Sequence, residues 1–130
     1  MRVFLSRQVS KLVRSERLPA GALCQAAREV VGGRFGGGEA FLGGDLFKKR
    51  VAREGGGKSG GFRFIIAYRA PKVQRVLFVH AFAKNEASTL TPKGHSALAK
   101  VARAFVRTDD EQIQELLAAR EFREISCDGD

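Results

Sequence analysis

The chain has 130 residues, of which 44% are hydrophobic and 28% are charged, and this balance is typical of one folded domain. Lys and Arg outnumber Asp and Glu by 23 to 14, giving a formal charge of +9, which favours a polyanionic partner because phosphate contacts release condensed counterions. Nucleic acid is therefore the first candidate, and an acidic protein is compatible with the same charge. We expect a single domain over residues 1–122 and a polar tail at 123–130.

The two cysteines, Cys24 and Cys127, lie at opposite ends of the chain and show no CxxC or metal-ligand spacing. The first residues lack a long apolar segment with a cleavage site, and no apolar run approaches the length of a membrane span. We therefore expect a fold that needs no disulfide, metal or cofactor, no membrane contact, and a location in the reducing cytoplasm.

The N-terminal part predicts one strand and two helices. Residues 2–5 are short, apolar and β-prone, and Ser6 offers a side-chain oxygen that can cap a helix, which Pro19 ends. Apolar residues at helical spacing predict a second helix that stops at Gly32-Gly33. The two helices are expected to form an antiparallel pair. We interpret residues 32–44, which are rich in glycine, as a connecting loop.

Three β-prone segments follow, and we expect them to form an antiparallel meander. Side chains two residues apart share a face of a sheet, so Phe47 and Val51 lie on one face while Lys48 and Arg50 project from the other. In the second segment the aromatic and branched side chains form a bulky face, and Arg63 projects from the opposite face. The segments are residues 46–53, 62–69 and 75–82.

Two helices are predicted near the C-terminus. Thr91 is a good capping residue and Pro92 suits the first helical position, while the pattern Thr108-x-x-Glu111 predicts a capping box for the last helix. The predicted order is β-α-α-β-β-β-α-α. We therefore expect an α+β fold in which the N-terminal helices pack on a small antiparallel sheet, with further helices at the C-terminus.

The glycine-rich segment GGGKSGG at residues 55–61 does not match a phosphate-binding P-loop. The first glycine of that motif would fall on Ala52, and a strand follows instead of a helix. A plain flexible hairpin tip is the simple alternative. However, Lys58 lies at the tip and Arg53 flanks it, and Lys49 lies on the strand leading in, so the hairpin is suited to grip a phosphate backbone.

The run LFKKRVAREGGGKSGGFRFIIAYR, followed by RVLFVHAFAKNEASTL, resembles the HigB-type branch of the RelE toxin family over roughly residues 40–105. The resemblance implies a RelE-like fold and a toxin of a type II toxin-antitoxin pair. It also implies a ribosome-dependent endoribonuclease that cuts mRNA, with a helix-turn-helix antitoxin as its partner. In such enzymes the 2′-hydroxyl of the RNA attacks the phosphate, which leaves a 2′,3′-cyclic phosphate and a 5′-hydroxyl without a metal.

The resemblance also assigns the site. Arg63 and Lys84 would stabilise charge on the phosphate, and Lys48 is the best candidate for proton transfer. Archetypal members carry an arginine and then a tyrosine where this chain has Asn85 and Thr91, so the general acid stays open. The expected catalytic residues are Lys48, Arg50, Arg63 and Lys84. The expected RNA-binding residues are Lys49, Arg53, Lys58 and Asn85.

The role of His80 has two alternatives. Alternation places His80 with Val76, Phe78 and Phe82, which favours a packed histidine over a catalytic one.

The main rival function is a non-catalytic protein of the same fold, either a ParE-like gyrase poison or a basic RNA-binding module. The four candidate cations favour cleavage. A third alternative is a decayed toxin that only binds its antitoxin and DNA.

Overall fold

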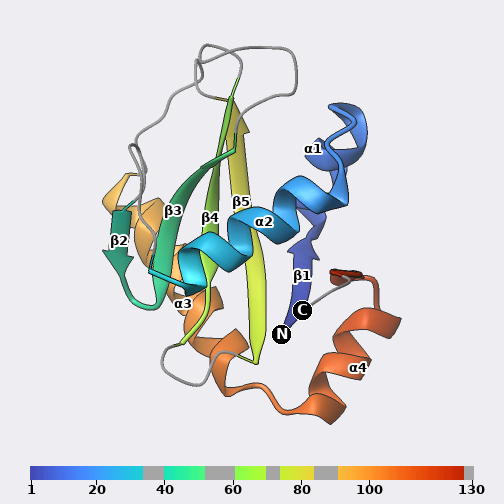
Figure 1. Ribbon diagram of the computed structural model, residues 1–130. Coiled ribbons are helices and arrows are strands. Elements are labelled where there is room, and N and C mark those ends of the chain that lie inside the picture. Colours follow the sequence, from blue (N-terminus) through green and yellow to red (C-terminus); the bar gives the residue numbers. More distant parts are fainter. Residues whose placement is uncertain (34–39, 52–60, 70–73, 84–90, 128–130) are drawn as a thin grey trace.

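The computed structural model describes residues 1–33, 40–51, 61–69, 74–83 and 91–127, and within these ranges the chain forms a six-stranded sheet and four helices (Figure 1). The strands are β1 (Arg2–Ser6), β2 (Ala40–Gly43), β3 (Leu46–Val51), β4 (Phe62–Ala67), β5 (Arg75–Ala83) and β6 (Phe122–Ile125). The helices are α1 (Arg7–Ser15), α2 (Ala20–Val31), α3 (Pro92–Arg107) and α4 (Asp110–Ala118).

The sheet is larger than the predicted meander and is mixed. The strand order is β2-β3-β4-β5-β1-β6, so the antiparallel meander β3-β4-β5 is confirmed, but β1 runs parallel to β5. Two edge strands of the sheet were not predicted. β2 lies inside the segment 32–44 that we interpret as a loop, and β6 takes up the start of the predicted tail 123–130. Both are only four residues long, and the side chains of β6 are half-buried or exposed, so no clear apolar alternation marks them.

Helices cover the sheet on both sides, as Figure 1 shows with α2 and α3 on opposite faces. The apolar side chains of α1 and α2 pack against the bulky face of β4, so the N-terminal helices do lie on the sheet. The second core lies on the opposite face, under α3 and α4. The first core includes Val9, Leu23, Val30, Phe62, Phe64, Ile66 and Phe78, and the second includes Phe4, Leu46, Ile65, Leu77, Phe105 and Ile113.

Helix caps fit the local sequence, with one shift. The side chains of Ser6 and Thr91 cap α1 and α3, as predicted. For α4 the capping box begins one residue later than predicted: the Asp109 carboxylate accepts a hydrogen bond from the backbone N–H of Gln112 at 2.8 Å, and the backbone N–H of Asp109 donates one to Oε1 of Gln112 at 3.1 Å. The Thr108 hydroxyl is instead bonded to a backbone carbonyl of α3, which leaves the cap to its neighbour.

A disulfide joins Cys24 of α2 to Cys127, which follows β6. This corrects the expectation that the fold uses no disulfide. The reason is topological, because β6 pairs with β1 and thereby brings the C-terminal segment next to the helices that follow β1. The two Cα atoms lie 5.6 Å apart although 103 positions separate them in the sequence.

Candidate functional site

Three basic side chains and one histidine share a face of the meander, at the end where β3 and β5 finish. Arg50 pairs directly with Arg63 across β3 and β4, and Lys48 pairs with Ile65, which pairs in turn with His80 on β5. Directly opposite residues project to the same side of a sheet. Lys48, Arg50 and Arg63 are therefore brought together, as predicted from alternation, and His80 joins them.

Arg63 presents a buried hydrogen-bond donor on this face. Its side chain is half-buried, and its Nη1 atom is buried without a hydrogen-bond partner in the part of the chain that the structure describes. A buried charged donor without a partner costs free energy, and an oxygen of an anion would satisfy it. Arg63 also pairs with Phe82 on β5, whose side chain is buried.

The three strands that form this face supply charge of one sign. The segments Leu46–Val51, Phe62–Ala67 and Arg75–Ala83 contain no Asp or Glu, so none of the three strands supplies a carboxylate to balance the cations. Like charges directly opposite each other in a sheet are destabilising. Such a concentration of cations on a partly buried surface attracts a negatively charged ligand.

His80 shares the face of the candidate site and not that of Phe78, which corrects the face predicted from alternation. The register between β4 and β5 shifts after Ile65, so that one extra residue of β5 turns His80 to the side of Phe82 and away from Phe78. The ring centroids of His80 and Phe82 are 6.2 Å apart. Burial lowers the pKa of His80 below its usual value, so its imidazole is neutral at pH 7 and can accept a proton.

Lys49, a predicted RNA contact, is separated from the other cations. It pairs with Phe64 and therefore lies on the opposite face, against α2. The side chain is buried, and its Nζ atom lies 2.9 Å from Oε1 of Glu29 on α2. This position fits an internal ion pair that fastens α2 to β3, and we leave Lys49 out of the candidate site.

The other four predicted site residues lie outside the described residues. They are Lys84, predicted to be catalytic, and Arg53, Lys58 and Asn85, predicted to bind RNA. The candidate site that the structure describes is therefore built from Lys48, Arg50, Arg63 and His80. Of these, His80 is the one that alternation alone assigns to the wrong face, because a register shift in a strand leaves no signal in its apolar pattern.

No group of three or more His, Cys, Asp or Glu side chains in the described ranges could hold a metal ion. No helix there is both long enough and apolar enough to cross a membrane.

Comparison with known proteins adds the family. The profile of the family described as "RelE toxin of RelE / RelB toxin-antitoxin system" matches residues 1–125, a range that includes every helix and strand named above. A search of curated proteins found no match. The mixed sheet with helices on both faces agrees with a RelE-like fold. Because the match covers nearly the whole sequence, the chain belongs to the RelE toxin family.

Proposed function

We propose that the chain is the toxin of a type II toxin-antitoxin pair and that it acts as an endoribonuclease of the HigB-type branch, cutting mRNA on the ribosome. The observation that carries this proposal is Arg63, whose buried Nη1 has no hydrogen-bond partner among the described residues and whose cross-strand neighbour is another arginine. Two guanidinium groups on one sheet face offer forked donors to the oxygens of one phosphate. The family match supports a toxin with this chemistry.

The proposed reaction uses the RNA's own 2′-hydroxyl and needs no metal. Its oxygen attacks the adjacent phosphorus, the bond from phosphorus to the 5′ oxygen breaks, and the products are a 2′,3′-cyclic phosphate and a 5′-hydroxyl. One group must take the proton of the 2′-hydroxyl, and another must give a proton to the leaving 5′ oxygen. Arg50 and Arg63 neutralise the charge that develops on the phosphate oxygens.

His80 and Lys48 are suited to the two proton transfers. They lie in one row of the sheet with Ile65 between them. Because adjacent strands are about 4.8 Å apart, groups on β3 and β5 in one row are about 10 Å apart at the backbone. In-line attack places the attacking and leaving oxygens on opposite sides of phosphorus, so one group can stand at each. Neutral His80 takes the proton, and the Lys48 ammonium donates one.

The remaining predicted residues keep their proposed roles. Lys84 adds a further positive charge at the phosphate, while Arg53, Lys58 and Asn85 contact the RNA on either side of the cleaved bond. No cofactor takes part. The place of action is the cytoplasm, where ribosomes translate mRNA, and in that reducing compartment Cys24 and Cys127 are exposed to conditions that favour thiols.

The proposed protein partner is a helix-turn-helix antitoxin with an acidic segment. Complementary charge speeds association with a toxin of charge +9 and selects this partner over others. To silence the toxin, the antitoxin must cover the face that carries Lys48 and Arg63, or displace the C-terminal helices. A complex in which that face stays accessible and cleaves RNA would contradict this part of the proposal.

The test is cleavage of a translated mRNA in a purified translation system. Wild-type protein should produce fragments with 5′-hydroxyl ends and 2′,3′-cyclic phosphates, and inducible expression in cells should stop protein synthesis. Mapping the ends by primer extension, with and without phosphatase and kinase treatment, identifies the chemistry. If folded protein accumulated while synthesis rates stayed unchanged and mRNA remained intact, a non-catalytic member of the fold would replace this proposal.

A further inference from the structure

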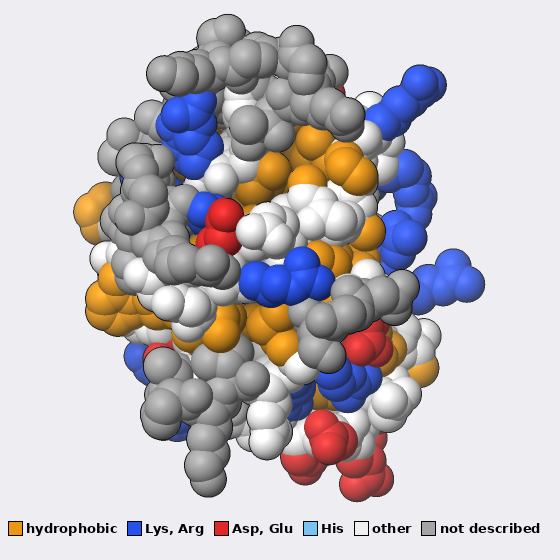
Figure 2. Space-filling view, in the orientation of Figure 1, with side chains coloured by type: hydrophobic (Ala, Val, Ile, Leu, Met, Phe, Trp, Pro, Cys, Tyr) orange, Lys and Arg blue, Asp and Glu red, His pale blue; other side chains and the backbone are white. Residues whose placement is uncertain are grey.

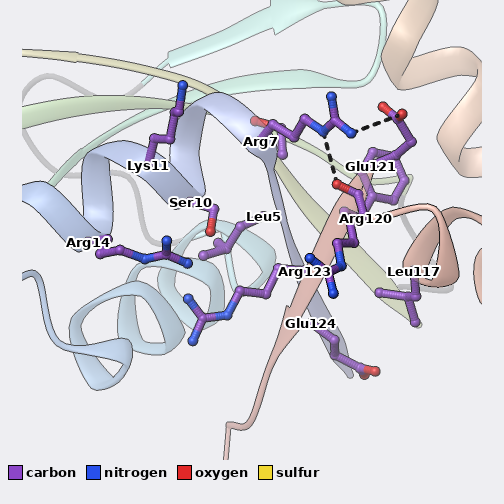
Figure 3. A pocket seen from close by; sticks show the side chains of 12 residues that line it. Leu5, Arg7, Ser10, Lys11, Arg14, Leu117, Arg120, Glu121, Arg123 and Glu124 are labelled. Carbon is purple, nitrogen blue, oxygen red and sulfur yellow. Dashed lines mark hydrogen bonds and ion pairs between the residues drawn. The ribbon is translucent and has the colours of Figure 1, made fainter.

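A basic groove lies away from the cations of β3 and β4, between α1 and the turn that joins α4 to β6 (Figure 3). Its volume is about 730 Å³, and its walls combine apolar side chains such as Leu5 and Phe122 with many charged ones. The basic residues that line it are Arg7, Lys11, Arg14, Arg120 and Arg123. None of them belongs to the candidate cleavage site.

The two carboxylates of the groove are already paired. Glu124 accepts hydrogen bonds from Nε and Nη2 of Arg2 at 2.8 and 2.9 Å, and this pairing lowers the pKa of Glu124. Glu121 lies 3.6 Å from Nη2 of Arg7. Within the described ranges no ion pair engages Lys11, Arg14 or Arg123. The groove therefore keeps an excess of exposed positive charge.

The cations are arranged in a row along one wall. Arg7, Lys11 and Arg14 are spaced four and then three residues apart, so they share one face of α1. At 1.5 Å per residue they are about 6 and about 4.5 Å apart along the helix axis. Figure 3 shows Arg14 of α1 and Arg123 of β6 directed toward each other across the groove. Figure 2 shows Lys and Arg side chains projecting along the side where α1 lies in Figure 1.

The groove begins beside the strand that carries His80. The Ser6 hydroxyl, at the start of α1, donates a hydrogen bond to the carbonyl of Val79 at 2.8 Å. The Gln8 side chain forms two hydrogen bonds with the backbone of Ala81, at 2.7 and 2.9 Å. These bonds fix the first turn of α1 to the residues on either side of His80. The wall of the groove and the candidate site are therefore attached to the same segment of β5.

We propose that this groove is a second RNA-binding site, which holds the phosphate backbone outside the position of cleavage. A row of cations, two of which, Lys11 and Arg14, have no ion pair among the described residues, fits a chain with regularly spaced phosphates. Two facing cations such as Arg14 and Arg123 repel each other until an anion lies between them. The attachment of both sites to one segment of β5 favours RNA, which can contact both sites, over an acidic polypeptide. The inference does not depend on cleavage, since it concerns binding alone.

The test compares two double variants with the same change of net charge. Lys11→Gln with Arg14→Gln removes two cations from the groove, and the control, Lys100→Gln with Arg107→Gln, removes two exposed cations from α3. The probe is a labelled single-stranded oligonucleotide of about 12 nucleotides with 2′-O-methyl groups, which the proposed reaction cannot cleave. Fluorescence anisotropy over a range of NaCl concentrations measures the affinity, and an oligo-glutamate peptide of the same length is a second probe.

We expect the groove variant to bind the oligonucleotide on the order of tenfold more weakly than the control variant does, and its plot of log affinity against log salt to be less steep by about 1.4, since each lost phosphate contact removes about 0.7. Equal losses in both variants would overturn the proposal, because net charge alone would explain them. Loss of peptide binding with full oligonucleotide binding would also overturn it, in favour of an acidic polypeptide. If the protein bound RNA through the groove but cleaved no mRNA, the proposed cleavage would be refuted and the groove proposal would stand.

Discussion

Arg50 and Arg63 are direct cross-strand neighbours, and the Nη1 atom of Arg63 is buried without a hydrogen-bond partner among the described residues. Two like charges placed opposite each other in a sheet reduce its stability. The pair is therefore the basis of the phosphate site that we propose.

Arg63→Ala should lower the rate of mRNA cleavage by about two to three orders of magnitude, because it removes one electrostatic contact to the transition state. The free energy of unfolding should stay the same or rise slightly, since a like-charge pair is removed. Arg63→Lys should remain impaired, because a lysine lacks the forked donors of a guanidinium. Cleavage at matched folded concentration and urea unfolding measure the two effects. Cleavage by Arg63→Ala at the wild-type rate would end the assignment of this residue.

Lys48 and Lys49 are adjacent in the sequence but should behave in opposite ways. Lys48→Ala should lower cleavage strongly with little effect on stability, since the side chain lies on the candidate site. Lys49→Ala should instead lower the free energy of unfolding by about 1–2 kcal/mol, because a buried side chain and its pairing with Glu29 are lost. Each variant is the control for the other. The same pattern in both variants would contradict the separation of the two faces.

His80→Gln tests the proposed base. Glutamine is similar in size but cannot accept the proton, so cleavage should fall by about two to four orders of magnitude. In the wild type, burial lowers the pKa of His80 below its usual 6.5, so activity should be retained at pH 6.5 and decline only as pH falls through the lowered pKa. A single-turnover pH profile measures this decline at acid pH, and the residual activity of His80→Gln should not show it. The same decline at acid pH in the variant would show that another group causes it.

The lowered pKa of His80 also makes the stability of the fold depend on pH. Protonation of His80 is harder in the folded chain than in the unfolded chain, because burial penalises the charged imidazole. Its contribution to stability is therefore fully present above pH 6.5 and is lost as pH falls through the lowered pKa of the folded state. Urea unfolding of the wild type and His80→Gln at pH 8 and at pH 5 should show a smaller loss for the variant at the lower pH.

Removal of the disulfide should destabilise the fold without changing the chemistry. The bond closes a loop between positions 103 residues apart, and a disulfide of this kind contributes about 2–4 kcal/mol by restricting the unfolded chain. The variant Cys24→Ser with Cys127→Ser should therefore unfold at lower urea concentration than the oxidised wild type and match the reduced wild type. Its cleavage rate under native conditions should be unchanged. Equal midpoints for the oxidised and reduced wild type would show that the bond adds no stability.

The sequence by itself determined the local elements and the division of the meander into faces. Caps such as Ser6 and Thr91 act on backbone groups within three residues, and alternation in β3 and β4 separates Lys48, Arg50 and Arg63 from the bulky side chains by strand geometry alone. The motifs of β3, of the glycine-rich segment and of the FAKNE segment together gave the resemblance to the RelE toxin family, which the match over residues 1–125 confirms. These signals are short in range, so they can be read without a three-dimensional arrangement.

The tertiary structure decided what depends on contacts between distant segments. The placement of β1 between β5 and β6 brings Cys24 to Cys127, and a register shift in β5 turns His80 toward the candidate site. The same packing gives Lys49 a partner on α2 and places the cations of α1 opposite Arg123. Each of these outcomes depends on which segment lies beside which. A periodic pattern along one strand or helix contains no information about its neighbour, because pairing and packing energies arise only when both partners are in place.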